Sequence, residues 1–124
     1  MPELTDTSTF EEMVSGLAKP GEAIIASLTP DKAHILHMAV GVAGEAGELL
    51  DAVKKHVIYN KDIDRKNVVE ELGDLEFYME GLRQRLGISR QETIIANINK
   101  LGERYKGLKY SDQAAQDRAD KQGE

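Results

Sequence analysis

Apolar residues recur at helical spacing along most of this 124-residue chain, and nothing alternates with period two for long enough to predict a strand. Thr29-Pro30-Asp31 is a strong helix start, and the apolar stripe after it predicts a helix to about His56. A polar turn over residues 58–63 separates it from a second long helix, capped by Asp64 and ended by Gly87. The short turn predicts an antiparallel helix hairpin, with apolar stripes at Ile35, Met38, Val42, Ala46, Leu49 and Val53, and at Val68, Leu72, Leu75, Met79, Leu82 and Leu86.

The ends of the chain carry shorter helical signals. Ser8 and Thr9 precede Glu11 and Glu12 in a capping-box pattern, which predicts a first helix to about Ala18, whereas residues 21–28 are ambiguous. Ser89 with Glu92 predicts the start of a last helix that runs to about Tyr105, with Ile94, Ile95, Ile98 and Leu101 as its apolar positions. The expected fold is therefore all-α, with four to five helices.

We expect three segments along the chain: an N-terminal helix and linker (1–28), a helical domain that carries the site (29–105), and a polar tail (106–124). The tail has few apolar anchors, so it should be exposed or lie over a partner subunit. A chain this short buries a modest fraction of its surface, and self-association would help to stabilise it.

Composition narrows the class of protein. Hydrophobic residues make up 40% and charged residues 31% of the chain, as in soluble globular proteins. There is no cysteine, which excludes disulfides and thiolate metal sites. No apolar run is long enough to span a bilayer, and the polar start of the chain is wrong for a secretory signal, so we expect a cytoplasmic protein. A net charge of −6 argues against binding nucleic-acid polymers, but a metal ion could still recruit small phosphates.

We expect the functional site on the two long helices, where two pairs of acidic residues lie next to the apolar stripes. Glu45 and Glu48 share a face of one helix, and Glu71 and Asp74 share a face of the other. Each pair is equally far from the turn centre near residues 59–60, so an antiparallel hairpin brings all four carboxylates to one level. Like charges beside an apolar core are unfavourable unless a hard divalent cation such as Mg²⁺ binds between them.

Two structural alternatives remain for these acids. They could be solvated residues paired with Lys54, Lys55, Arg65 or Lys66, as on many acidic helix faces. A di-iron carboxylate bundle normally takes Glu-x-x-His on two helices, and no histidine stands in either motif here. His34 and His37 lie about two turns away and are poorly placed as ligands.

Glycines and cations add weaker signals. Gly41, Gly44 and Gly47 lie inside one long helix and Gly73 and Gly81 inside the other; close helix packing is the simpler explanation for Gly41 and Gly44, and space for a ligand is the alternative. Asn97, Lys100 and Arg104 share one face of the last helix. They could hold phosphate oxygens, or simply form an exposed basic end favoured by the helix dipole.

These motifs, in this order, resemble those of the MazG-like nucleotide pyrophosphohydrolases. The resemblance covers residues 34–118 and rests on GVAGEAGEL (41–49), VEELGDL (69–75) and NINKLGERY (97–105), which carry the E-x-x-E, E-x-x-D and N-x-x-K-L-x-x-R-Y patterns of single-domain phage and bacterial members.

The resemblance implies hydrolysis of a nucleoside triphosphate, often a deoxynucleotide, to monophosphate and pyrophosphate with Mg²⁺, for which Mn²⁺ could substitute. It places the metal on residues Glu45, Glu48, Glu71 and Asp74, and the phosphates on Lys100 and Arg104, with Asn97 on the same face as a further candidate. As a mechanistic hypothesis, Glu48 or Glu71 acts as the catalytic base, because neighbouring carboxylates raise its pKa. Tyr105 closes the motif as a further substrate-binding candidate. The resemblance also implies a homodimer or homotetramer in which helical bundles and active sites are completed across subunits.

Two other functions remain open. The substrate could be a specialised nucleotide, such as phosphoribosyl-ATP or an alarmone. The chain could also be a non-catalytic nucleotide-binding or helical interaction module, against which the complete set of acids argues.

Overall fold

The computed structural model describes residues 7–121, and within that range every regular element is helical. The chain divides into two compact units between Ala33 and His34, which are described separately. The first contains α1 (Thr7–Leu17), α2 (Gly21–Ser27) and the first turn of α3 (Pro30–Val57). The second holds the rest of α3, α4 (Arg65–Leu86), α5 (Arg90–Arg104), and the short elements η1 (Lys106–Leu108), α6 (Asp112–Asp117) and η2 (Ala119–Lys121). The predicted all-α class is confirmed, while residues 1–6 and 122–124 of the predicted end segments lie outside the described range.

The helix ends follow the capping chemistry of the sequence. The Asp64 side chain accepts a hydrogen bond from the backbone N–H of Asn67 at 3.0 Å, and Ser89 accepts one from Glu92 at 2.9 Å. Gly87 ends α4 in the left-handed conformation, at φ 70°, where glycine has no steric penalty. These three predicted boundaries are therefore confirmed. At the first helix the prediction was wrong in detail, since Ser8 and Thr9 lie inside α1, and the ambiguous segment forms α2.

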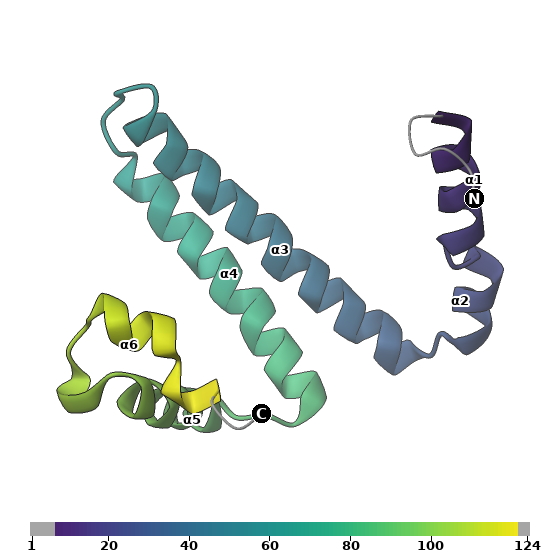
Figure 1. Ribbon diagram of the computed structural model, residues 1–124. Helices are drawn as coiled ribbons and strands as arrows, with labels where there is room; N and C mark the ends of the chain where they lie inside the picture. Colours follow the sequence, from purple (N-terminus) through teal and green to yellow (C-terminus); the bar gives the residue numbers. More distant parts are fainter. Residues whose placement is uncertain (1–6, 122–124) are drawn as a thin grey trace. The chain divides into compact units, whose positions relative to one another are not determined.

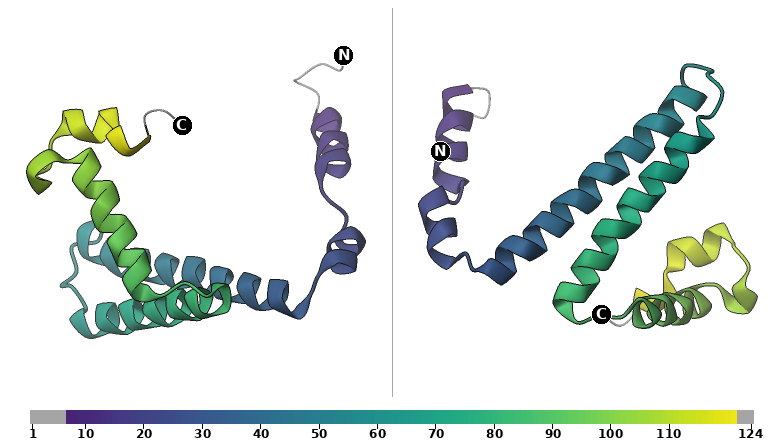
Figure 2. Two further views of the ribbon diagram at one scale, coloured as in Figure 1. Left: turned by 90° about the horizontal axis from the view of Figure 1, so that it is seen from below. Right: turned by 180° about the vertical axis from the view of Figure 1, so that it is seen from behind.

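Helices α3 and α4 lie side by side and run in opposite directions (Figures 1 and 2). They touch at two glycines: Gly41 of α3 lies against the ring of Tyr78, and Gly81 of α4 lies against the Met38 side chain. A Cβ atom at either glycine would clash with these side chains. The close-packing prediction is thus confirmed for Gly41 and is wrong for Gly44, around which no other group lies within 4 Å.

The single chain has very little interior. Among the described residues, the buried apolar side chains are Met38 and Ala52, both on α3. Several side chains of the predicted apolar stripes on the other helices are exposed to solvent. These are Leu72 and Leu86 on α4, and Ile94, Ile95, Ile98 and Leu101 on α5. Large apolar side chains left in water are unfavourable in a folded monomer.

The segment after α5 is more ordered than a polar tail. Gly107, at φ 72°, turns the chain at η1, and α6 and η2 then lie against α5. Ser111 caps α6 by accepting a hydrogen bond from the N–H of Ala114 at 3.0 Å. Most residues in the described part of this segment are exposed, as expected of a polar tail, and the segment also packs on its own chain.

None of the described helices has the length and apolar character needed to cross a lipid bilayer.

Candidate functional site

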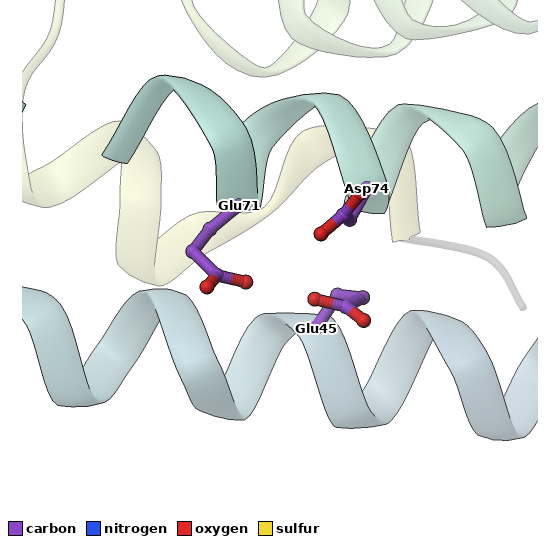
Figure 3. A group of neighbouring side chains, drawn as sticks. All are labelled: Glu45, Glu71 and Asp74. Atoms are coloured by element: carbon purple, nitrogen blue, oxygen red, sulfur yellow. The ribbon is translucent and has the colours of Figure 1, made fainter. Parts of the chain in front are cut away.

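The acids of α3 and α4 meet between the two helices. Glu45, Glu71 and Asp74 each offer a carboxylate oxygen within 4.8 Å of the other two, and Figure 3 shows all three side chains pointing into the space between the helices. Glu45 and Glu71 are half-buried, whereas Asp74 is exposed. Three carboxyl groups therefore face one point, and water cannot fully solvate the two that are half-buried.

Helix phase explains why Glu45 is there. It lies on the same face of α3 as the two buried residues Met38 and Ala52, which precede and follow it by two helical turns. Glu45 therefore occupies a core position of the helix rather than one beside the core. Glu71 holds the corresponding inward position on α4 with Leu75 and Tyr78.

The electrostatics of this cluster are unfavourable without a cation. A hydrogen bond with the Glu45 carboxyl and burial raise the pKa of Glu71 to about 6. The negative charges of Glu45, Glu48 and Asp74 contribute smaller parts of the same rise to about 6. A hydrogen bond between two carboxyl groups requires a proton that only one of them needs to carry, so Glu71 keeps a proton that an exposed glutamate would lose.

One oxygen of the cluster has no partner. The Oε2 atom of Glu71 is buried and accepts no hydrogen bond, which is unusual for a carboxylate oxygen. Carboxylate oxygens are the ligands that Mg²⁺, Mn²⁺ and Ca²⁺ prefer, and a divalent cation would both occupy this oxygen and displace the proton. The residues present therefore fit a hard divalent cation.

Glu48 is not one of the three gathered carboxylates. It lies exposed on α3, one turn beyond Glu45, yet its charge contributes to the raised pKa of Glu71. It is therefore close enough to influence the cluster while it remains exposed to water.

The alternative that these acids form ion pairs with nearby cations is not supported by the contacts of Lys54 and Lys55. Lys55 pairs with Asp51 at 3.1 Å, and Lys54 lies 5.6 Å from the ring centroid of Tyr59. Both lysines thus interact within the end of α3 rather than with the carboxylate cluster.

The predicted phosphate-binding residues lie on α5, apart from the carboxylates. Asn97 and Lys100 line a cavity of about 440 Å³ with Thr93, Ile94 and Ala96. Tyr105 stacks at a tilt on Tyr110, with ring centroids 5.7 Å apart, beside a second cavity of about 260 Å³. None of the clustered carboxylates lines either cavity.

Arg104 has a partner that the sequence did not indicate. Its Nε donates to Oδ1 of Asp120 at 2.9 Å, and one terminal nitrogen donates to Oδ2 at 3.4 Å. Only the folding of the C-terminal segment brings Asp120 to α5, and its sixteen-residue separation from Arg104 carries no local signal.

Fold and site together define an all-helical protein with a carboxylate cluster of the kind that suits a divalent cation. Residues 34–108, more than half of the chain, match the family model described as the MazG nucleotide pyrophosphohydrolase domain. The chain belongs to this family, and the predicted family relationship is confirmed. Its domain class is therefore that of a nucleotide pyrophosphohydrolase, a hydrolase. No curated protein and no solved structure matches the chain.

Proposed function

We propose that this protein hydrolyses nucleoside triphosphates, deoxynucleotides among them, to the monophosphate and pyrophosphate with Mg²⁺. The observation that carries the proposal is the meeting of Glu45, Glu71 and Asp74 around the unpartnered Oε2 of Glu71. The chain's membership of a nucleotide pyrophosphohydrolase family supports the same reaction.

Glu45, Glu71 and Asp74 would hold the ion, and Mn²⁺ could replace Mg²⁺ because both favour oxygen ligands. A bound divalent ion would supply positive charge to the triphosphate oxygens as the bond to the leaving pyrophosphate breaks. Glu45 and Glu71 fix the position of that charge, because both are half-buried on facing helices.

A base must take a proton from the attacking water. Glu48 is exposed and is not one of the three carboxylates within 4.8 Å, so its oxygens stay available for that proton. Glu71 is the alternative base, since its raised pKa brings it closer to neutral pH. Substitution of each residue separates these roles.

Asn97, Lys100 and Arg104 would bind the phosphates, with Tyr105 as a further contact to the substrate. Two cations on one helix face, an exposed lysine and a half-buried arginine, support this role, because lysine offers a point charge and arginine a planar fork to phosphate oxygens. A homodimer or homotetramer would bury the open apolar face of α5 and complete the helical bundle and the site across subunits. We expect the enzyme in the cytoplasm.

The test is a panel of ribo- and deoxynucleoside triphosphates, phosphoribosyl-ATP and an alarmone, followed by pyrophosphate release with Mg²⁺, Mn²⁺ or EDTA. The proposal expects pyrophosphate from nucleoside triphosphates that EDTA abolishes. Turnover confined to phosphoribosyl-ATP or the alarmone would instead assign a specialised substrate. Nucleotide binding without release of pyrophosphate or phosphate from any compound would make the protein a non-catalytic binding module.

A further inference from the structure

A largely enclosed ion pair joins the end of α5 to the C-terminal segment. The side chains of Arg104 and Asp120 are only 16% and 6% exposed, whereas the acidic partners in the other described pairs are at least 45% exposed. The two oxygens of Asp120 meet two nitrogens of Arg104, which is the side-on fork that guanidinium groups also present to phosphates.

Asp120 also lies in the field of a second cation of the same face. The hydrogen bond from Arg104 is the largest cause that lowers the pKa of Asp120, and the charges of Arg104 and Lys100 act in the same direction. One carboxylate thus pairs with Arg104 and lies within the electrostatic influence of Lys100.

The rest of that face is open. The cavity at Asn97 and Lys100 contains none of the residues of α6 or η2 in its lining. Arg104 itself lines a cavity of about 480 Å³ together with the cations Lys106 and Lys109 and the acids Glu103 and Asp117. A phosphate chain could therefore approach Arg104 from open space, but the guanidinium nitrogens that would bind it already pair with Asp120.

From this geometry we infer that Asp120 is an internal competitor of substrate phosphate: η2 blocks Arg104, and the segment must leave before a polyphosphate binds there. The inference rests on the proposed phosphate-binding role of Arg104. A tethered carboxylate competes at high effective concentration, whereas a polyphosphate carries more charge and bridges Lys100 and Arg104 together. The apparent affinity for polyphosphate is then reduced by the fraction of molecules in which the pair is closed.

The test measures binding of inorganic pyrophosphate to the full chain by calorimetry, with Ca²⁺ present and without nucleotide. Asp120→Asn removes the competing charge but keeps the side-chain size, so pyrophosphate should bind about tenfold more tightly than to the unchanged protein. Asp112→Asn removes the same charge from the same segment, where the partner is the Tyr110 hydroxyl, and should leave the affinity nearly unchanged.

Two further measurements separate competition from a purely structural role. Hydrogen exchange in residues 112–121 should speed up when pyrophosphate is added to the unchanged protein, because the segment is displaced. In Asp120→Asn, the additional change Arg104→Gln should abolish the gain in affinity.

Equal or weaker binding by Asp120→Asn overturns the inference and makes the pair an anchor of the segment. An equal gain in Asp112→Asn overturns it too, because general charge would then explain the effect. Absence of pyrophosphate binding in every variant also rejects it, and nucleotide hydrolysis by the unchanged protein decides separately whether the proposed function stands.

Discussion

At the scale of single residues, Glu45, Glu48 and Glu71 differ in burial and hence in the chemistry each can perform. Glu45 and Glu71 face inward and suit a cation, whereas Glu48 is exposed beside them. Glu48→Gln should lower kcat by at least about a hundredfold, the usual contribution of a general base, and leave Mg²⁺ affinity within a few-fold. Glu71→Gln should instead weaken Mg²⁺ binding, because it removes a ligand with a buried oxygen.

Steady-state hydrolysis and Mg²⁺ calorimetry on the two variants check this assignment, and circular dichroism reports whether the helices persist. Glu70→Gln is the matched control, since Glu70 adjoins Glu71 but is exposed, and it should behave like the unchanged protein. Near-normal turnover by Glu48→Gln would remove Glu48 from the catalytic role.

The raised pKa of Glu71 makes metal binding depend on pH. Its folded-state pKa is about 6 against an ordinary value of 4.5, so the bound proton stabilises the metal-free fold below pH 4.5. This stabilisation is lost as the pH rises through 6, where a cation takes the proton's place. Mg²⁺ should therefore raise Tm more at about pH 7.5 than at about pH 5, and bind more tightly.

Thermal unfolding with and without Mg²⁺ across this range measures the effect. In Glu71→Gln the pH dependence between 4.5 and 6 should flatten, because the titrating group is gone. A Mg²⁺ shift that is equally large at both ends of the range would contradict the assignment of Glu71 to the metal.

At the scale of elements, the chain's helix ends were predictable because capping is local. Asp64, Ser89 and Gly87 act within one turn of their own positions. The phase of the packed face was harder to predict. The apolar stripe through Val42 and Val53 predicted that Glu45 lies beside the core. In the structure Val53 is 41% exposed, and the buried residues of α3 lie on the same helix face as Glu45.

The missing information was the fit between side chains of different helices. Tyr78 lies against Gly41, and this contact helps to decide which line of α3 faces α4. The pairing of Arg104 with Asp120 was equally hard to predict, because it depends on the left-handed backbone at Arg118. An arginine rarely adopts this conformation, so the residue type does not predict the turn. Interactions within one helix could thus be predicted from the sequence. Contacts between helices could be predicted only for the acids, where a motif on one helix is matched by a motif on the other.

Replacement of two glycines of α3 by alanine should change the free energy of unfolding in opposite directions. In Gly41→Ala the Cβ meets the Tyr78 ring, and the overpacking should lower the free energy of unfolding by about 1–3 kcal/mol. Gly44→Ala adds a methyl to open space within this chain and should raise it by up to about 1 kcal/mol through helix propensity. Urea unfolding at one protein concentration measures both.

The pair of variants distinguishes packing within the chain from packing by something else. A destabilised Gly44→Ala would mean that a ligand or a second copy comes close to this part of α3. A harmless Gly41→Ala would mean that Tyr78 moves aside, and that this contact does not set the phase of α3 against α4.

At the scale of the whole molecule, the exposed apolar surface is the dominant feature. Ile95 and Ile98 on α5 are 47% and 57% exposed, while the described interior contains only two buried apolar residues. Full burial of one such side chain from water contributes about 1.5–3 kcal/mol, so a second copy that covers the half-exposed side chains of α5 would stabilise the assembly.

We therefore predict that the protein sediments as a dimer or tetramer, and that Ile98→Glu shifts it toward monomer. A buried glutamate in an apolar contact is costly unless it has a partner, so the variant should weaken association at least about a hundredfold. Analytical ultracentrifugation across a concentration series measures the shift, and Gln91→Glu, at an exposed position of the same helix, is the matched control.

The same experiment links assembly to catalysis. If the cations of α5 serve a carboxylate cluster on another copy, activity of Ile98→Glu should fall with dilution in step with the loss of dimer, whereas Mg²⁺ binding should persist, because Glu45, Glu71 and Asp74 meet within one chain. Full activity from a monomer at every concentration would show that each chain holds a complete site, and that the open face of α5 has a different purpose.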